Sequence, residues 1–311
     1  MNETLQNEAT NPATSVGIYY FSGTGNTEAV AEAFVAAFRR RGATADLARM
    51  EPFTQKREAP GVGLYDVIGI GYPIHAFNAP RIVFEFIDLL PAGRGRRAFL
   101  FKCPGDPFVN GGSTHPVRRR LSARGYDVVH ESMLVMPANL AVKYPPEMVK
   151  ELYDIACRRM AFYTREILAG IPRLQGNGWM ERLFTLLSPV ERFGARMLRL
   201  HFSVRRCCTG CGLCARCCPA SNIRMSHDRP CFSWRCLACL RCVYLCPVRA
   251  IGLRGFNFVL FKDGYNIRAV LDDRRTRPAF PAPGERGYYR RFLAYANDSP
   301  GGDQGSRSAA P

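Results

Sequence analysis

Two runs of cysteine share the spacing C-x2-C-x2-C-x3-C, and a proline follows each run. The first run comprises Cys208, Cys211, Cys214 and Cys218, and the second comprises Cys236, Cys239, Cys242 and Cys246. The copies lie 28 residues apart, and the offset continues to Ile223 and Ile251, so the segment is an internal duplication. Soft thiolates bind the iron of a cubane cluster, and x2 spacings wrap three thiolates around one cluster.

The fourth cysteine of each run is carried away by the proline turn, so we expect it to bind the cluster of the other run. Cluster I is then held by Cys208, Cys211, Cys214 and Cys246, and cluster II by Cys236, Cys239, Cys242 and Cys218. A single C-x2-C also suits zinc, but two complete copies with both prolines favour iron–sulfur clusters. The remaining cysteines of this region, Cys207, Cys217 and Cys231, are interpreted as free thiols packed like small hydrophobic residues.

A second chemical motif, SGTGNT at 22–27, lies between an apolar run and a helical pattern. Its glycines let the backbone curl, and its hydroxyls and N–H groups can surround a phosphate at a helix start. It lacks the G-x-G-x-x-G of dinucleotide sites and the G-K-[ST] of a P-loop. The turn therefore suits a terminal monophosphate that stays bound.

Strands and helices alternate around this turn. Apolar runs predict strands at 16–21, 43–50, 65–72, 96–103 and 126–136, and helical spacing predicts helices at 28–41, 81–90, 115–124 and 146–169. This alternation predicts an α/β fold with a doubly wound parallel five-stranded sheet.

The motifs resemble two known families. CTGCGLCARCCPASNI and CLACLRCVYLCPVRAI resemble the halves of bacterial two-cluster ferredoxins, which implies two [4Fe-4S] clusters in a small α+β domain. IYYFSGTGNTEAVA resembles the phosphate turn of flavodoxins, which implies FMN and the strand order 2-1-3-4-5. By this resemblance the phosphate is held by Ser22, Thr24, Gly25, Asn26 and Thr27. The loops that flank the flavin ring would contribute Tyr72, Pro73, His75, Phe77 and Asn78, and, from the next loop, Asn110, Gly111 and Gly112.

The predicted organisation follows from these motifs. It has a flexible start (1–14), a flavodoxin-like FMN domain (15–170), amphipathic linker helices (171–204), a ferredoxin-like domain (205–255), a basic extension (256–296) and a disordered tail (297–311).

Together the motifs resemble a family of flavodoxin–ferredoxin fusion proteins. The resemblance implies an electron carrier that relays electrons between FMN, the two clusters and other redox proteins. The alternative is an FMN-dependent reductase of a small acceptor, such as a quinone, nitro compound or nicotinamide, supplied with electrons by the clusters. The sequence has no nicotinamide-binding fingerprint, which favours the relay, and no catalytic residue is assigned.

Charge is distributed unevenly along the chain. Residues 1–170 contain 20 Lys/Arg against 17 Asp/Glu, whereas residues 171–311 contain 23 against 9. Because the basic half also holds the anionic clusters, we expect acidic redox partners and not nucleic acid. A membrane-surface contact through the basic amphipathic segment is the less favoured alternative. No signal peptide is recognised, so a cytoplasmic location is expected, where cysteines bind metals more often than they form disulfides.

Overall fold

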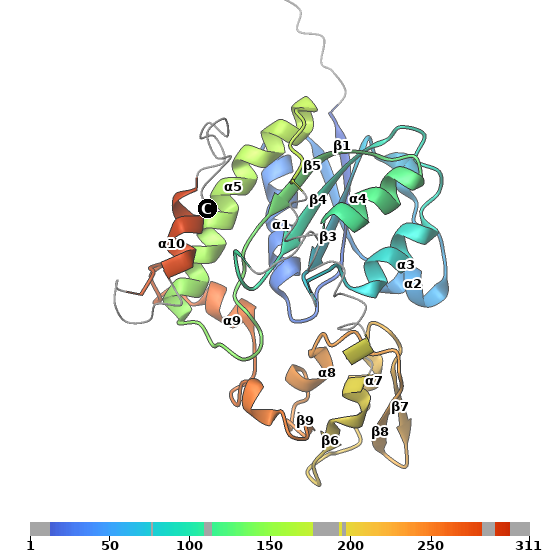
Figure 1. The fold of residues 1–311 in the computed structure, drawn as a ribbon, viewed down its shortest axis with the longest axis vertical. Coiled ribbons are helices and arrows are strands. Elements are labelled where there is room, and N and C mark those ends of the chain that lie inside the picture. Colours follow the sequence, from blue (N-terminus) through green and yellow to red (C-terminus); the bar gives the residue numbers. More distant parts are fainter. Residues whose placement is uncertain are drawn as a thin grey trace, which may run out of the picture.

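The computed structural model describes residues 13–75, 77–108, 114–176, 193–194, 197–281 and 290–298 (Figure 1). Five parallel strands form the large sheet: β1 (Ser15–Tyr20), β2 (Thr44–Arg49), β3 (Val67–Pro73), β4 (Arg97–Cys103) and β5 (Asp127–Met133). Their order is β2-β1-β3-β4-β5, which is the doubly wound, flavodoxin-like order. The predicted fold class is confirmed, and a second, small α+β domain is present. Among the described helices, none combines the length and the hydropathy that a membrane span requires.

Helices cover both faces of the sheet. They are α1 (Asn26–Arg39), α2 (Glu51–Lys56), α3 (Arg81–Leu89), α4 (Thr114–Ala123) and α5 (Pro146–Ala169), with a 3-10 turn at Val62–Leu64. Helices α1 and α5 pack on one face, where Phe34 of α1 meets the rings of Phe99 and Phe101. The other face is covered by α2, α3 and α4 (Figure 1). Because both faces are covered, the central strands read as nearly continuous apolar runs.

The small domain is built from two halves with the same element order. The first half contains β6 (Phe202–Val204), α7 (Leu213–Arg216) and β7 (Ile223–Ser226), and the second contains β8 (Arg229–Phe232), α8 (Arg241–Tyr244) and β9 (Ile251–Leu253). Helices α7 and α8 differ by the 28-residue offset of the cysteine motifs. The backbone repeats as well, because Gly210 and Gly212 have positive φ angles, as do their counterparts Ala238 and Leu240.

Strand pairing crosses between these halves. The first strand, β6, pairs antiparallel with the last, β9, while β7 pairs with β8. Each half therefore completes its sheet with a strand of the other half. The small domain includes β6, so it begins a few residues before the predicted start at 205.

The segments that flank the small domain both contact the large one. After α5, Arg173 pairs with β5, since its N–H donates to the Val129 carbonyl at 2.9 Å. Most of the predicted linker helices, residues 177–192 and 195–196, lie outside the described residues.

The predicted basic extension folds back onto the large domain. A 3-10 turn at Asn257–Val259 leads into α9 (Ile267–Asp272), and α10 (Arg290–Asn297) lies beside α5 (Figure 1). Phe292 and Tyr295 of α10 are buried in the core that α1 and α5 form on the sheet. Asn297, where a disordered tail is predicted to begin, is the last residue of α10, and residues 299–311 lie outside the described part.

Candidate functional site

A cavity opens at the carboxyl edge of the large sheet, with an empty volume of ≈ 610 Å³. Four loops line it, each following a strand of the sheet. The lining residues are Ser22, Gly23, Thr24, Asn26 and Thr27 after β1, Pro73, Ile74 and His75 after β3, Cys103 and Gly105 after β4, and Pro137, Ala138, Asn139 and Leu140 after β5. Loops at this edge are where open α/β sheets bind ligands.

The turn after β1 leads directly into helix α1. Gly25 is the residue before the helix and has φ +102°, a conformation that glycine adopts readily. Ser22 Oγ accepts a 3.1 Å hydrogen bond from the Gly25 N–H and so closes the turn. The start of α1 therefore faces the cavity with the positive end of its dipole and with N–H groups that have no partner within the helix.

The hydroxyls of the turn differ in how they are engaged. Thr27 is buried, and its hydroxyl has no oxygen or nitrogen partner among the described residues. Thr24 Oγ1, in contrast, accepts a 3.0 Å hydrogen bond from Asn139 Nδ2. The Thr27 hydroxyl interacts with the Cys103 sulfur, which is a weak acceptor, so it fits a stronger bound acceptor such as a phosphate oxygen.

Asn26 serves mainly to hold the surrounding loops. Its Nδ2 donates to the Pro137 carbonyl at 2.7 Å, and the Tyr265 hydroxyl donates to its Oδ1 at 2.5 Å. Asn26 lines the cavity, but its side chain is already bonded on both ends. The loop at 137–140 and the residue Tyr265 were absent from the residues predicted for this site.

The predicted ring-flanking residues separate into two groups. Pro73 and His75 line the cavity, whereas Tyr72 is fully buried among the apolar residues beneath α3 and is not one of the lining residues. In a parallel strand buried on both faces, the alternation of side chains turns Tyr72 into the core.

Phe77 and Asn78 complete a tight turn and do not line the cavity. Backbone hydrogen bonds of 2.9 and 3.0 Å pair His75 with Asn78 across this turn, and Phe77 has φ 55°.

Burial lowers the pKa of His75 to about 4, so its imidazole is neutral near pH 7. Asn110, Gly111 and Gly112 lie outside the described residues.

A second cavity, in the small domain, is lined by cysteines of both motifs. Cys208, Cys211 and Cys214 come from the first motif and Cys246 from the second. Apolar side chains close its walls, among them Leu213, Met225, Pro230 and Ile251. These four thiols are the set expected to bind cluster I.

The other four cysteines lie together where the two domains meet. Burial, together with the neighbouring Cys239, Cys236 and Cys218, raises the pKa of the Cys242 thiol well above its usual value. Burial likewise raises the pKa of Cys239 to about 12. Such thiols lose their protons only when positive charge compensates, which bound iron would supply.

The sulfur atoms of the two crossing cysteines have equivalent settings. Cys218 Sγ accepts a 3.2 Å hydrogen bond from the Asn222 N–H, and Cys246 Sγ accepts one of the same length from the Ala250 N–H. Both donors lie four residues after the sulfur they contact. The arrangement suits a thiolate ligand, because hydrogen bonds to sulfur stabilise its negative charge.

The arrangement of the first four cysteines suits a cluster better than a single metal ion. No three His, Cys, Asp or Glu side chains in the described ranges are grouped so that they could hold a single metal ion. A cubane instead carries its irons at separate corners, so its thiolates surround a cavity, as the cysteines at Cys208–Cys214 and Cys246 do.

The remaining cysteines of the small domain, Cys207, Cys217 and Cys231, belong to neither set of four. Cys217 Sγ donates to the Cys214 carbonyl at 3.6 Å, and Cys207 Sγ donates to the Val248 carbonyl at 3.7 Å. Cys207 and Cys231 are exposed, so they are not packed as the sequence interpretation expected.

Comparison with known proteins finds similarity for about half of the chain. The flavodoxin of Megasphaera elsdenii is 28% identical and is matched over 98% of its length, covering 46% of this chain with a TM-score of 0.32. Flavodoxin 2 from Bacillus cereus is 17% identical over 99% of its length, covering 50% of this chain with a TM-score of 0.38. For rubredoxin oxygen:oxidoreductase of Desulfovibrio gigas the identity is 18% and the TM-score 0.36; 51% of this chain matches 37% of that protein.

Other comparisons give no match. No protein-family model matches the chain, and no curated protein matches it. The flavodoxin-like fold assignment therefore rests on the strand order and crossovers of the chain itself.

Proposed function

We propose that the protein is an electron-transfer protein that binds FMN in the cavity after the large sheet and one [4Fe-4S] cluster at each set of four cysteines. The observation that carries the proposal is the cavity in which Cys246 of the second motif meets Cys208, Cys211 and Cys214 of the first. Such crossed sets are what two-cluster motifs require. The phosphate-suited turn at the other cavity supports FMN as the flavin.

Each part of the chain has a defined task in this proposal. The N–H groups at the start of α1 and the Thr27 hydroxyl bind the phosphate, while Pro73 and His75 border the ring. The buried thiols of Cys239 and Cys242 release their protons as iron binds. FMN exchanges two electrons singly and each cluster exchanges one, so the cofactors together connect two-electron and one-electron chemistry.

The composition of anaerobically purified protein tests this proposal. We expect about eight iron and eight sulfide per chain, the sum of two cubanes, together with one FMN. A content near four iron, bound zinc in place of iron, or FAD in the extract would contradict the assignment.

Steady-state turnover separates a relay from a reductase. A relay passes electrons rapidly to a redox protein but turns over slowly with quinones, nitro compounds or nicotinamides. Fast, saturable turnover with one of these small acceptors would replace the relay by the reductase.

The surface of the small domain supports an acidic protein as the partner. Residues 202–254 contain nine arginines and a single acidic residue, Asp228. Many of these arginines are exposed: Arg205, Arg206, Arg216, Arg224, Arg229, Arg235, Arg249 and Arg254. Such a surface attracts an acidic partner at long range.

A further inference from the structure

The two cysteine motifs differ at the position before the third cysteine. The first motif has Leu213 there, and the second has Arg241. Arg241 is the first residue of α8, and its side chain is only 11% exposed. A buried arginine must be paired and hydrogen-bonded to be tolerated, so its partners indicate what it holds.

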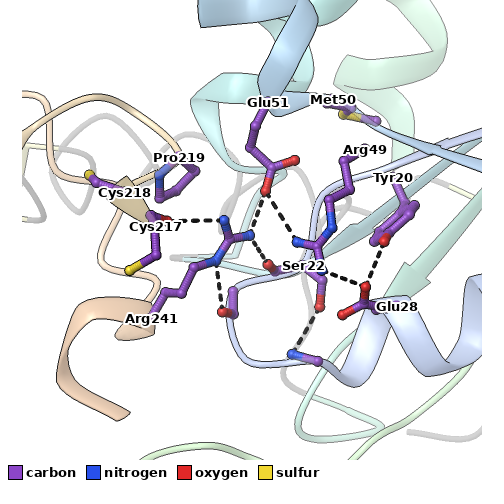
Figure 2. A network of polar contacts seen from close by, with 12 residues as sticks. Tyr20, Ser22, Glu28, Arg49, Met50, Glu51, Cys217, Cys218, Pro219 and Arg241 are labelled. Carbon is purple, nitrogen blue, oxygen red and sulfur yellow. Dashed lines mark hydrogen bonds and ion pairs between the residues drawn. The ribbon is translucent and has the colours of Figure 1, made fainter. Parts of the chain in front are cut away.

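Those partners belong mostly to the large domain (Figure 2). Arg241 donates to the backbone carbonyls of Ser22 and Gly23, the latter at 3.2 Å, and it forms a buried ion pair of 2.5 Å with Glu51. Its third nitrogen, Nη1, donates to the Cys217 carbonyl at 3.2 Å. One side chain thus joins the phosphate-suited turn, helix α2 and both cysteine motifs.

The Glu51 carboxylate is itself part of a larger charge network. Arg49 lies 3.8 Å from Glu51 and 2.5 Å from Glu28, which accepts a 2.8 Å hydrogen bond from the Tyr20 hydroxyl. Figure 2 shows Arg49, Tyr20 and Glu28 on the opposite side of Ser22 from Arg241. The network fixes the side chain that pairs with Arg241, and so fixes the contact between the domains.

Other residues of the large domain also contact the main chain of the second cysteine set. A Cβ added to Gly23 would lie 2.7 Å from the Cys239 carbonyl oxygen and 3.1 Å from Cys239 Cβ. His75, which lines the flavin cavity, is hydrogen-bonded through Nδ1 to the Leu237 carbonyl at 2.9 Å. Gln55 donates to the Cys218 carbonyl at 3.1 Å. All three contacts reach cluster II ligands or the residue between two of them.

The first cysteine set has a different setting. Cys211 is exposed, and its carbonyl accepts its 3.0 Å hydrogen bond from Arg216 of the same half. Cys239, its counterpart in the second motif, is buried in the core cluster that includes Phe21 and Ile82 of the large domain. The two sets therefore lie at unequal distances from the flavin cavity.

We infer that Arg241 is a positioning residue that holds the second cysteine set, Cys236, Cys239, Cys242 and Cys218, against the turn that binds the flavin phosphate. The second set is then the metal site next to the flavin, and the first set is the outer site. The inference rests on the proposed function, since it presupposes FMN and both clusters.

Phosphorus NMR of bound FMN tests the order of the sites. Reduced clusters are paramagnetic and broaden the phosphate signal of the FMN, and the broadening falls steeply with distance. Reducing the wild-type protein should broaden the line strongly. A Cys211→Ser variant that lacks the first cluster should keep this broadening, whereas Cys236→Ser should lose most of it. Equal loss in both variants, or loss only in Cys211→Ser, would overturn the inference.

Substitution of Arg241 tests its positioning role. Arg241→Gln should keep about eight iron, bind FMN roughly tenfold more weakly because the turn loses charged hydrogen bonds, and narrow the broadened line. Arg216→Gln is the matched control, because it removes an arginine from α7 that donates to a cysteine carbonyl within its own half. It should leave both FMN readouts unchanged.

A third variant covers the case in which Arg241→Gln loses the second cluster altogether. Glu51→Gln removes the charge on the large-domain side and leaves every residue of the small domain in place. Like Arg241→Gln, it should weaken FMN binding and narrow the phosphorus line, and it should retain eight iron. Unchanged FMN affinity and line width in both Arg241→Gln and Glu51→Gln would overturn the role of Arg241. Failure of the proposed function would be visible earlier, as wild-type protein without FMN or without iron.

Discussion

The two halves of the small domain share a spacing and a backbone, but they face different surroundings. In the first half, Thr209, Cys211 and Arg216 are exposed. In the second half, Leu237 and Cys239 are buried against the large domain. Repetition explains the fold of the halves, whereas the residues that differ between them explain where each one lies.

The second half adopts its turns without the glycines of the first. Ala238 has φ 53° and Leu240 has φ 59°, where the first half has Gly210 and Gly212. A left-handed conformation costs a residue with a side chain of order 1 kcal/mol. Leu240 offsets this cost by burying its side chain in the core of the small domain, while Leu237 and Cys239 beside these turns pack against the large domain.

The largest expected effect comes from removing Cys218, the cysteine of the first motif that is expected to bind the cluster of the second. Cys218→Ala should abolish cluster II and leave cluster I, although Cys218 lies in the first motif, because its neighbours are the thiols of the second. Cys217→Ala is the control and should keep both clusters. Electron paramagnetic resonance of the reduced protein measures both. Loss of cluster I in the Cys218 variant would refute the crossing.

A smaller effect is expected from disturbing the contact that only the second half makes with the large domain. Gly23→Ala would force a methyl group against the Cys239 carbonyl and should destabilise the folded protein by about 1–3 kcal/mol, as overpacking typically does. Gly63→Ala, where a Cβ meets nothing within 4 Å, should change stability little. Urea unfolding under anaerobic conditions compares the two. Equal midpoints would show that this contact does not hold the second half against the large domain.

The next prediction concerns the turn that the second half contacts. Thr27→Ala combined with Thr24→Ala should weaken FMN binding, since each hydrogen bond lost to a charged group costs about 1.5–3 kcal/mol. Each single variant should account for part of the loss, because the Thr24 oxygen accepts from Asn139 and its own O–H can still donate to a phosphate. Thr44→Ala, at the opposite edge of the sheet, is the control. Flavin fluorescence titration measures the affinity, and an unchanged value in the double variant would argue against a phosphate site.

The smallest expected effect concerns the exposed arginines of the small domain, which we expect partners to approach. Electron transfer to an acidic ferredoxin or flavodoxin should slow as salt screens the arginines. Arg224→Gln with Arg229→Gln should lower the rate a few-fold at low salt, whereas Arg119→Gln on α4 should not. Stopped-flow rates at several ionic strengths decide the matter. A rate that does not change with ionic strength would contradict electrostatic steering. Tight binding to anionic vesicles would favour a membrane-surface contact instead.

Local patterns explain why much of the fold could be predicted. Apolar runs such as Val67–Gly71 identify buried strands, and the 28-residue offset identifies the two halves and their crossed cysteines. Glycine and hydroxyl residues likewise identify the turn at Ser22–Thr27, because that chemistry depends on neighbours in sequence.

The contacts that could not be predicted join residues far apart in the chain. Tyr265 contacts Asn26 across 239 residues of the chain, and Arg241 contacts Glu51 across 190. The local periodicity of the sequence cannot predict such contacts. One signal was present for Arg241, namely the replacement of the apolar Leu213 by a charged residue at an equivalent position of the repeat.

The return of the chain to α10 makes the small domain an insertion and not an appendage. The polypeptide leaves the large domain after Arg173, builds the small domain, and comes back to bury Phe292 and Tyr295 beside α5. A domain tethered at both ends explores far fewer orientations than one on a single linker, so the two sites stay at high effective concentration. Exchange of the small domain for a free ferredoxin would lose this advantage, and a chain cut after 255 would lose part of the core of the large domain.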